Sequence, residues 1–144
     1  MKSVLLLALA LCPSLALADA TSDLAKIDKA FEACIAKDES NMGMKMCTGE
    51  AYEAADKLLN RNYKNTVLEL KKDSGDKYTN ESNAEILKRV VAAQKAWIPF
   101  KDAQCNLEGT TMLGGSGESL MIGGCMYRMT VDRVKALAEF GSAQ

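Results

Sequence analysis

The chain has 144 residues, with 18 Lys and Arg against 19 Asp and Glu, giving a formal net charge of −1 at pH 7. This balance, without a basic block, excludes a phosphate-binding surface for nucleic acid, and the length suits one domain with one core. The chain contains no histidine, which is the commonest general base and metal ligand in proteins. We therefore expect no metal, no cofactor and no enzymatic activity.

The N-terminal segment has the features of an export signal. Lys2 supplies the positive start, residues 4–11 form an apolar run, and residues 16–18 (Ala-Leu-Ala) form a small-x-small cleavage site. Cleavage there leaves 126 residues beginning at Asp19. The segment carries one basic and no acidic residue, so its removal changes the net charge from −1 to −2. The apolar run is too short to span a bilayer, and no later segment is long enough.

The sequence thus predicts a signal peptide over residues 1–18 and one domain over residues 19–144, located in the periplasm or secreted. Cys12 lies inside the signal. Because Leu11 rather than a small residue precedes it, we expect it to be removed with the signal and not lipidated.

The front of the mature chain predicts two helices. Apolar residues recur every three or four positions over residues 21–37 and again from about 44 to 72. The polar residues 38–41 and nearby Gly43 predict a turn between them, and residues 73–76 (Asp-Ser-Gly-Asp) end the second helix. The apolar positions are Leu24, Ile27, Phe31, Cys34 and Ile35, then Cys47, Ala51, Tyr52, Ala55, Leu58, Leu59, Tyr63, Val67 and Leu70.

The back of the chain predicts two further helices. Ser82 precedes Glu85 by the spacing of a capping box, which predicts a helix start. Pro99 should kink or locally end this helix, with one more turn reaching Cys105. A glycine loop over residues 109–117 and a last helix over about 119–140, weakened by Gly123 and Gly124, complete the chain. The expected buried face of the third helix is Ile86, Leu87, Val90, Val91, Ala93, Trp97 and Phe100.

Four cysteines remain in the mature chain, an even number typical of two disulfides in a small exported protein. Three connectivities are possible, and the order of the helices favours the local pairing Cys34–Cys47 with Cys105–Cys125. Each ring of roughly 15 to 20 residues would contribute about 3 kcal/mol of stability. Oxidised cysteines also make thiolate chemistry and zinc binding unlikely functions. The predicted fold is all-α, a small disulfide-stapled bundle of about four helices with a long helical hairpin.

An ordered series of residues resembles the LprI-type family of small exported bacterial proteins. The resemblance extends from about Cys34 to Leu137 and implies a binding protein of the lysozyme-inhibitor type. One departure is Lys101, where the family more often has Arg, and an ammonium cannot grip a carboxylate with two bonds. The series is Cys47-x-x-Glu50-x-Tyr52-x-x-x-Asp56-x-x-Leu59-Asn60-x-x-Tyr63, then Gln94-x-x-Trp97-x-x-Phe100-Lys101-Asp102-x-x-Cys105, then Gly114-Gly115-Ser116, Cys125, Thr130 and Arg133.

Two groups of residues are expected to act mainly in the structure. Tyr52, Asp56, Asn60 and Tyr63 share one helix face, which indicates a polar helix–helix contact, with a ligand groove as the alternative. Lys101, Asp102 and Arg133 are expected to join one ion-pair network, because the second disulfide would bring them close.

Two further features offer a binding surface. Gly114, Gly115 and Ser116 predict a turn with positive φ angles. Alternatively, this disulfide-based loop, with Glu118 and Ser119, inserts into an enzyme cleft, since a pre-ordered loop loses little entropy on docking. Trp97 is expected to pack in the core, with a sugar-stacking platform as the alternative.

The resemblance implies a non-enzymatic protein that blocks the cleft of a lysozyme-type muramidase. The mildly acidic charge is compatible with binding a basic lysozyme. The alternative is a structural or regulatory periplasmic protein that binds another envelope protein through an exposed helix face. A third class, a cell-wall hydrolase, would use Glu50, Asp56 or Asp102, but no spacing singles out an acid and a nucleophile.

Overall fold

The computed structural model describes residues 15–142. It contains four α-helices and a short 3-10 turn, and no strand is present within this range. The predicted all-α fold is confirmed. Residues 1–14 of the predicted signal lie outside the described range. The elements are α1 (Leu15–Ile35), α2 (Asn41–Leu70), α3 (Lys77–Gly109), η1 (Thr110–Met112) and α4 (Glu118–Ser142).

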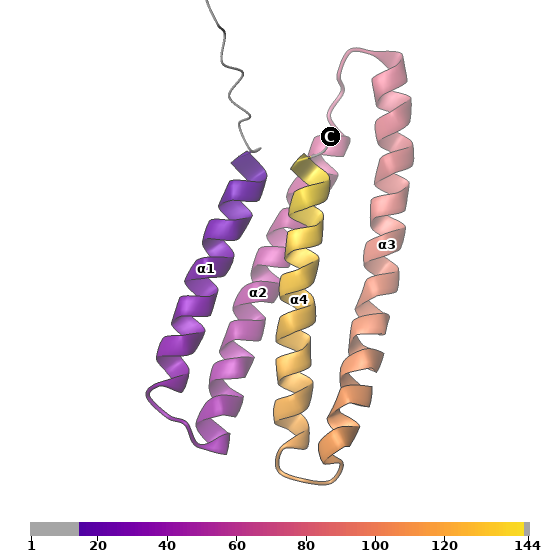
Figure 1. Ribbon diagram of the computed structural model, residues 1–144. Helices are drawn as coiled ribbons and strands as arrows, with labels where there is room; N and C mark the ends of the chain where they lie inside the picture. Colours follow the sequence, from indigo (N-terminus) through magenta and orange to yellow (C-terminus); the bar gives the residue numbers. More distant parts are fainter. Residues whose placement is uncertain (1–14, 143–144) are drawn as a thin grey trace, which may run out of the picture.

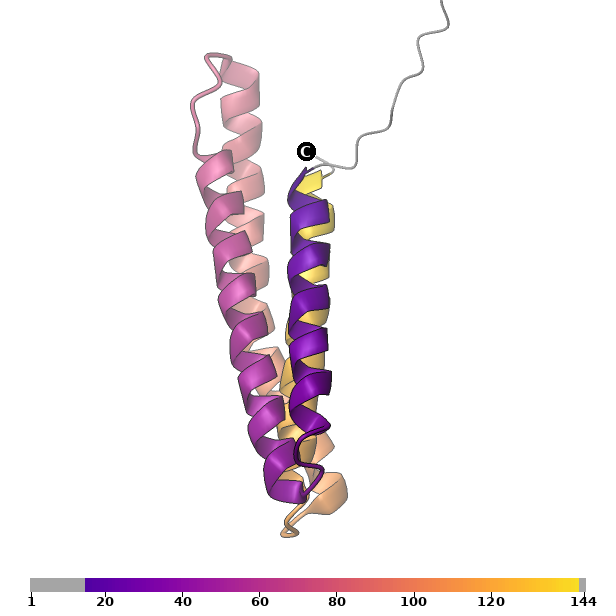
Figure 2. The same cartoon turned by 90° about the vertical axis from the view of Figure 1, so that its left-hand side faces the viewer.

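The helices run alternately up and down, so α2 and α4 are parallel to each other and antiparallel to α1 and α3 (Figure 1). α2 packs most extensively against α4 and least against α3. The hairpin of α2 and α3 extends beyond the upper ends of α1 and α4 (Figure 2). This is the long hairpin that the sequence predicts. None of the helices in residues 15–142 combines the length and the apolar character needed to cross a membrane.

Short polar segments set the helix starts. Ser40 caps α2, its hydroxyl accepting a hydrogen bond from the backbone N–H of Gly43 at 3.1 Å. The sequence places Gly43 in the turn before α2. In the structure it lies in the first turn of α2 itself. Gly43 is also required by packing, because a Cβ there would lie 2.3 Å from the backbone oxygen of Asp38.

The start of α3 differs from the prediction. Asp76 is the N-cap, accepting from the backbone N–H of Thr79 at 2.8 Å, and the helix begins at Lys77. The predicted capping box at Ser82 and Glu85 is wrong, since Ser82 lies inside the helix. The segment that ends α2 also starts α3, because Gly75, with φ of +73°, allows the chain to reverse within a few residues.

Pro99 does not end α3, although a local end was one of the two expected outcomes. The helix continues through it for ten residues to Gly109. Proline cannot donate a hydrogen bond to the carbonyl four residues earlier, that of Lys95. Both residues are exposed, so that carbonyl can bond to solvent instead.

The large apolar side chains gather away from the disulfides, in the middle and upper part of the bundle. Leu59 and Val134 are the largest fully buried apolar side chains of this core. Ile27, Tyr63, Trp97 and Val131 pack against it while remaining half-buried, and the buried members are Ala20, Leu24, Leu58, Leu59, Val134, Leu137 and Ala138.

The buried face of α3 is only partly the one predicted. Val90 is buried and Trp97 half-buried, but Ala93 and Phe100 are exposed. The face that α3 turns inward is instead formed by Val90, Gln94, Lys101, Cys105 and Gly109. Because two of these residues are long and polar, a pattern based on hydrophobicity missed them and wrongly included Ala93 and Phe100.

Two disulfides have the predicted local pairing. Cys34–Cys47 joins the end of α1 to the start of α2, and Cys105–Cys125 joins the end of α3 to the start of α4. Both lie at the same end of the bundle, where each pair of helices is connected. Oxidised cysteines are typical of proteins outside the cytoplasm.

Close to the second disulfide, α3 and α4 approach until only glycine fits between them. A Cβ on Gly109 would lie 2.6 Å from Cγ1 and 2.9 Å from Cδ1 of Ile122 in α4. Such contacts are far shorter than real Cβ contacts, so with a larger residue the Ile122 side chain would have to rotate away or the two helices would have to separate.

Gly109→Ala should therefore lower the free energy of unfolding by about 1–2 kcal/mol through overpacking. Urea unfolding measures the change. Gly49→Ala is the matched control, because that helical glycine has open space around it; the added methyl should stabilise it by about 0.5–1 kcal/mol. Ile122→Ala should lower the free energy of unfolding less in the Gly109→Ala variant than in the unaltered protein, since the methyl group added at residue 109 occupies part of the space that the Ile122 side chain leaves. If the two substitutions change the free energy of unfolding additively, Gly109 and Ile122 do not pack against each other.

Candidate functional site

Three regions of the surface collect the residues relevant to function: a polar contact between α2, α3 and α4, the turn between α3 and α4, and a hollow at the opposite end. The first contains most of the residues predicted to form a structural network. The second contains the predicted binding loop. The third was not singled out by the sequence.

The polar contact is centred on Lys101, which is only 5% exposed. Its ammonium donates a hydrogen bond to the hydroxyl of Tyr52 at 2.9 Å and lies 3.5 Å from the carboxylate of Asp102. The same ammonium lies 5.0 Å from the ring centre of Tyr52 and 5.4 Å from that of Trp97, within cation–π range. Burial alone would lower the pKa of Lys101, but the bond to Tyr52 and the charge of Asp102 outweigh it and raise the pKa.

The sequence predicts that Arg133 joins Lys101 and Asp102 in one ion-pair network, but among the described residues Arg133 pairs with neither of them. Its Nε donates to the side-chain oxygen of Gln94 at 3.0 Å, and its guanidinium lies 5.9 Å from the centre of the Trp97 ring. Burial without a carboxylate partner lowers the pKa of Arg133. In place of one ion-pair network there are thus two cationic contacts, each within about 6 Å of the Trp97 ring, which packs against the core.

The stripe on α2 is divided between different partners. Tyr52 bonds Lys101 in α3, Asp56 accepts from Asn60 at 2.8 Å within α2, and Tyr63 packs against the core. Of the carboxylates considered for hydrolysis, Glu50 and Asp102 are exposed, and Asp56 is half-buried.

The α3–α4 turn, residues 113–117, is held by its own hydrogen bonds. Gly114 has a φ of +73°, as predicted for a glycine turn, and its N–H donates to the Glu118 carboxylate at 2.8 Å. The N–H of Gly115 donates to the carbonyl of Met112 at 2.8 Å. Glu118 is therefore engaged in holding the turn. Trp97, twelve residues before the end of α3, lies about 18 Å further along the helix, so the predicted binding residues do not form one site.

A hollow of about 420 Å³ lies beside this turn. Gly115, Ser116 and Ser119 line one side of it, and Met42 and Lys45 of α2 line the other. The tip of the turn is apolar, since Leu113 is 73% exposed and Met112 is also exposed. The arrangement places exposed apolar side chains beside a recess lined by both polar and apolar residues, which suits contact with a protein surface.

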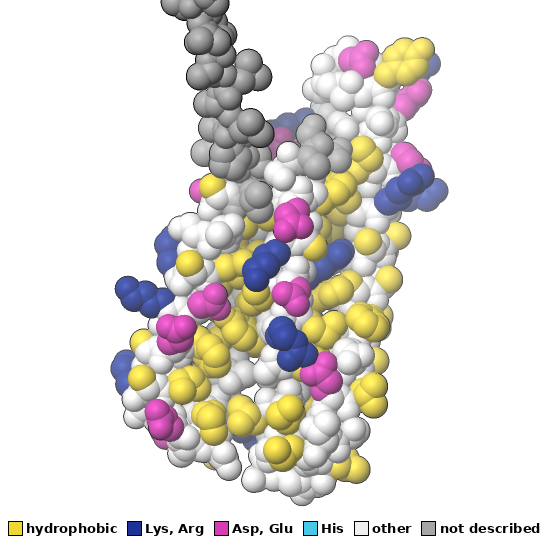
Figure 3. Space-filling model, viewed as in Figure 1, with side chains coloured by type: hydrophobic (Ala, Val, Ile, Leu, Met, Phe, Trp, Pro, Cys, Tyr) yellow, Lys and Arg dark blue, Asp and Glu magenta, His cyan; other side chains and the backbone are white. Residues whose placement is uncertain are grey.

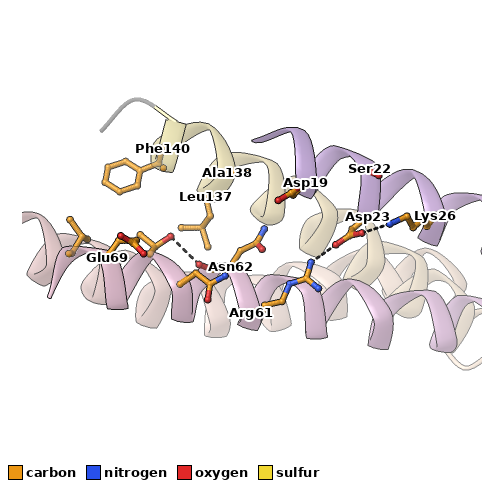
Figure 4. A pocket seen from close by; sticks show the side chains of 14 residues that line it. Asp19, Ser22, Asp23, Lys26, Arg61, Asn62, Glu69, Leu137, Ala138 and Phe140 are labelled. Atoms are coloured by element: carbon orange, nitrogen blue, oxygen red, sulfur yellow. Dashed lines mark hydrogen bonds and ion pairs between the residues drawn. The ribbon is translucent and has the colours of Figure 1, made fainter. Parts of the chain in front are cut away.

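The third region is a larger hollow of about 810 Å³ between α1, α2 and α4 (Figure 4). Arg61 and Lys26 both pair with Asp23, with an Nζ–Oδ1 distance of 2.8 Å for Lys26. Hydrogen bonds from Lys26 and then Arg61 lower the pKa of Asp23. Leu137 and Phe140 add apolar surface. No spacing in the sequence could indicate this hollow, because Asp23 and Arg61 meet only through the packing of α1 against α2.

Within residues 15–142, no group of histidine, cysteine, aspartate or glutamate side chains is arranged to hold a metal ion. The side chains of these three regions offer hydrogen bonds, cation–π contacts and apolar surface.

Tyr52→Phe should lower the free energy of unfolding by about 1–2 kcal/mol, because it removes the hydroxyl that accepts from the buried ammonium of Lys101. Chemical denaturation of both proteins measures this loss. Tyr63→Phe is the control, since the described residues form no hydrogen bond with the hydroxyl of Tyr63. Equal stability of the two variants would contradict a structural role for the Lys101–Tyr52 bond.

Comparison with known proteins agrees with the resemblance seen in the sequence. A family profile described as "Lysozyme inhibitor LprI" matches residues 34–137. A protein of Rhizobium meliloti (strain 1021), described as "Uncharacterized protein R02472", is 35% identical over 103 residues, which cover 69% of this chain and 73% of the relative. No solved structure matches. The matched region contains both disulfides, the Lys101 contact and the α3–α4 turn, and the chain belongs to the LprI family.

Proposed function

We propose that this protein is exported to the periplasm or the medium and acts as a non-enzymatic inhibitor of a lysozyme-type muramidase. Membership of a family described as lysozyme inhibitors, over most of the mature chain, is the observation that carries this proposal. The two disulfides support an extracytoplasmic location. The predicted charge of −2 on the mature chain is compatible with attraction to a basic enzyme at low salt.

The α3–α4 turn is the proposed contact surface. It projects at the lower end of the bundle (Figure 1) and ends in the exposed side chains of Met112 and Leu113. Cys105–Cys125 fixes the two helices that carry it, and the hydrogen bonds of Gly114 and Gly115 fix its backbone. A turn that is already ordered loses little conformational entropy when it enters a cleft, which favours binding.

The proposed mechanism is steric. The sugar cleft of a muramidase is a long groove, and a narrow convex turn can fill part of it. Leu113 would be covered on binding, while Ser116 and Ser119 would offer hydroxyls to polar groups on the rim. None of these residues needs to perform chemistry, since occupying the groove is sufficient to exclude the substrate.

Purified, oxidised protein at micromolar concentration should slow the clearing of a cell-wall suspension by lysozyme. Leu113→Asp should raise the inhibition constant at least about tenfold, because it places a charge on a side chain that becomes buried at the interface. Leu68→Asp is the matched control: Leu68 is 50% exposed but lies near the far end of α2.

The assay tests two claims separately: that the protein inhibits lysozyme, and that the α3–α4 turn is the contact surface. If the unaltered protein does not slow several lysozyme types, inhibition is removed as the function, and an endogenous envelope partner becomes the better explanation. If it inhibits and Leu113→Asp inhibits equally, the function stands and the turn is not the contact surface.

A further inference from the structure

The lower half of α3 carries an apolar stripe on its solvent-facing side. Ala93, Ala96, Phe100, Ala103 and Leu107 are all exposed and follow one another at spacings of three and four. These spacings place them along one side of the helix. Phe100 is 58% and Leu107 is 63% exposed. This set, called here the α3 stripe, extends for about 21 Å because an α-helix rises 1.5 Å per residue.

The outward face of α4 is charged, as an exposed helix face usually is. Acidic and basic side chains alternate along α4, whereas hydrophobic side chains follow the outer edge of α3 below its charged upper part (Figure 3). Lys95 and Asp102 do not interrupt the stripe, since they point about 140° and about 160° away from Phe100 around the helix. The exposed charged residues of α4 are Arg128, Asp132, Lys135 and Glu139.

We propose that the α3 stripe is the interface of a homodimer in which two copies of α3 pack antiparallel about a two-fold axis near Phe100. Alternating spacings of three and four are the pattern with which two helices interlock. In a two-fold interface, the same surface of each copy must be complementary to itself. The proposal does not depend on the inhibitory function.

The stripe has this self-complementarity. With Phe100 facing Phe100 of the second copy, Ala93 faces Leu107, and Ala96 and Ala103 lie at nearly the same level, offset by one residue or about 1.5 Å. Each large residue at the ends thus meets a small one, and the alanines allow the two helices to approach closely. No like charges oppose each other, because the stripe contains none.

The position of α3 also suits this arrangement. It lies at the edge of the bundle, and α2 packs only weakly against it, so its outer side is open to another molecule (Figure 1). A single pair of helices in contact over about 21 Å buries less than a standard stable interface, so the dimer should be weak. It should dissociate between about 1 µM and about 1 mM.

Sedimentation equilibrium of the oxidised protein over this concentration range tests the proposal. The average mass should rise from that of a monomer toward twice that value. Phe100→Glu should raise the dissociation constant at least about a hundredfold, because it places two carboxylates face to face at the axis. Leu68→Glu, a change at a comparably exposed apolar residue of α2, should leave the constant within about twofold.

Crosslinking tests the register. Phe100→Cys should form a disulfide with its own copy under mild oxidation, whereas Lys135→Cys on the charged face of α4 should not. Mass spectrometry of the non-reduced digest confirms that Cys34–Cys47 and Cys105–Cys125 remain paired.

Three outcomes would overturn the proposal. The unaltered protein could remain a monomer at the highest concentration. It could form a dimer that Phe100→Glu does not weaken, which would place the interface elsewhere. Finally, the protein could remain a monomer while Phe100→Glu abolishes lysozyme inhibition, which would assign the α3 stripe to a foreign partner.

Discussion

The structure depends on two covalent links at the end of the bundle where its interior is made of small side chains. Next to Cys34–Cys47 and Cys105–Cys125, the buried residues include Gly43, Thr48, Ala51 and Gly109, and Lys101 is the one long buried side chain in the adjoining turn of α3. Small residues bury little apolar area, and hydrophobic stabilisation scales with the area buried. Leucine and valine fill the middle and upper bundle instead. The disulfides thus restrict the unfolded chain where packing contributes least to stability, and they allow both helix pairs to approach closely.

The same constraint shapes the proposed binding surface. Because Cys105 and Cys125 fix α3 against α4, and Gly109 lets Ile122 come close, the five-residue turn that follows has little freedom. Its hydrogen bonds then determine which side chains project. Glu118 holds the backbone of Gly114, which leaves Leu113 as the exposed point. Rigidity at this turn comes from the helices behind it and not from the turn residues alone.

α3 reverses the usual relation between polarity and burial. It turns Gln94 and Lys101 inward, where Arg133 and Tyr52 satisfy their hydrogen-bonding groups. Buried polar side chains are tolerated only with such partners. The apolar residues of the same helix, Phe100 and Leu107, are left outside. One arrangement therefore explains both the polar contact around Trp97 and the α3 stripe, whose apolar surface remains available to a second molecule.

The sequence by itself determined the helical class and the approximate places of the turns, and it favoured the observed one of three disulfide pairings, because periodicity, glycine and the order of the cysteines are local properties. It also placed Gly114 correctly in a turn with positive φ. It could not decide which side of α3 faces inward, whether Asp76 or Ser82 caps that helix, or that Arg133 bonds Gln94 and not Asp102. Each of these depends on which residues of distant helices meet. Only the tertiary structure fixes that, since a polar side chain can be buried wherever a partner from another helix satisfies its hydrogen bonds.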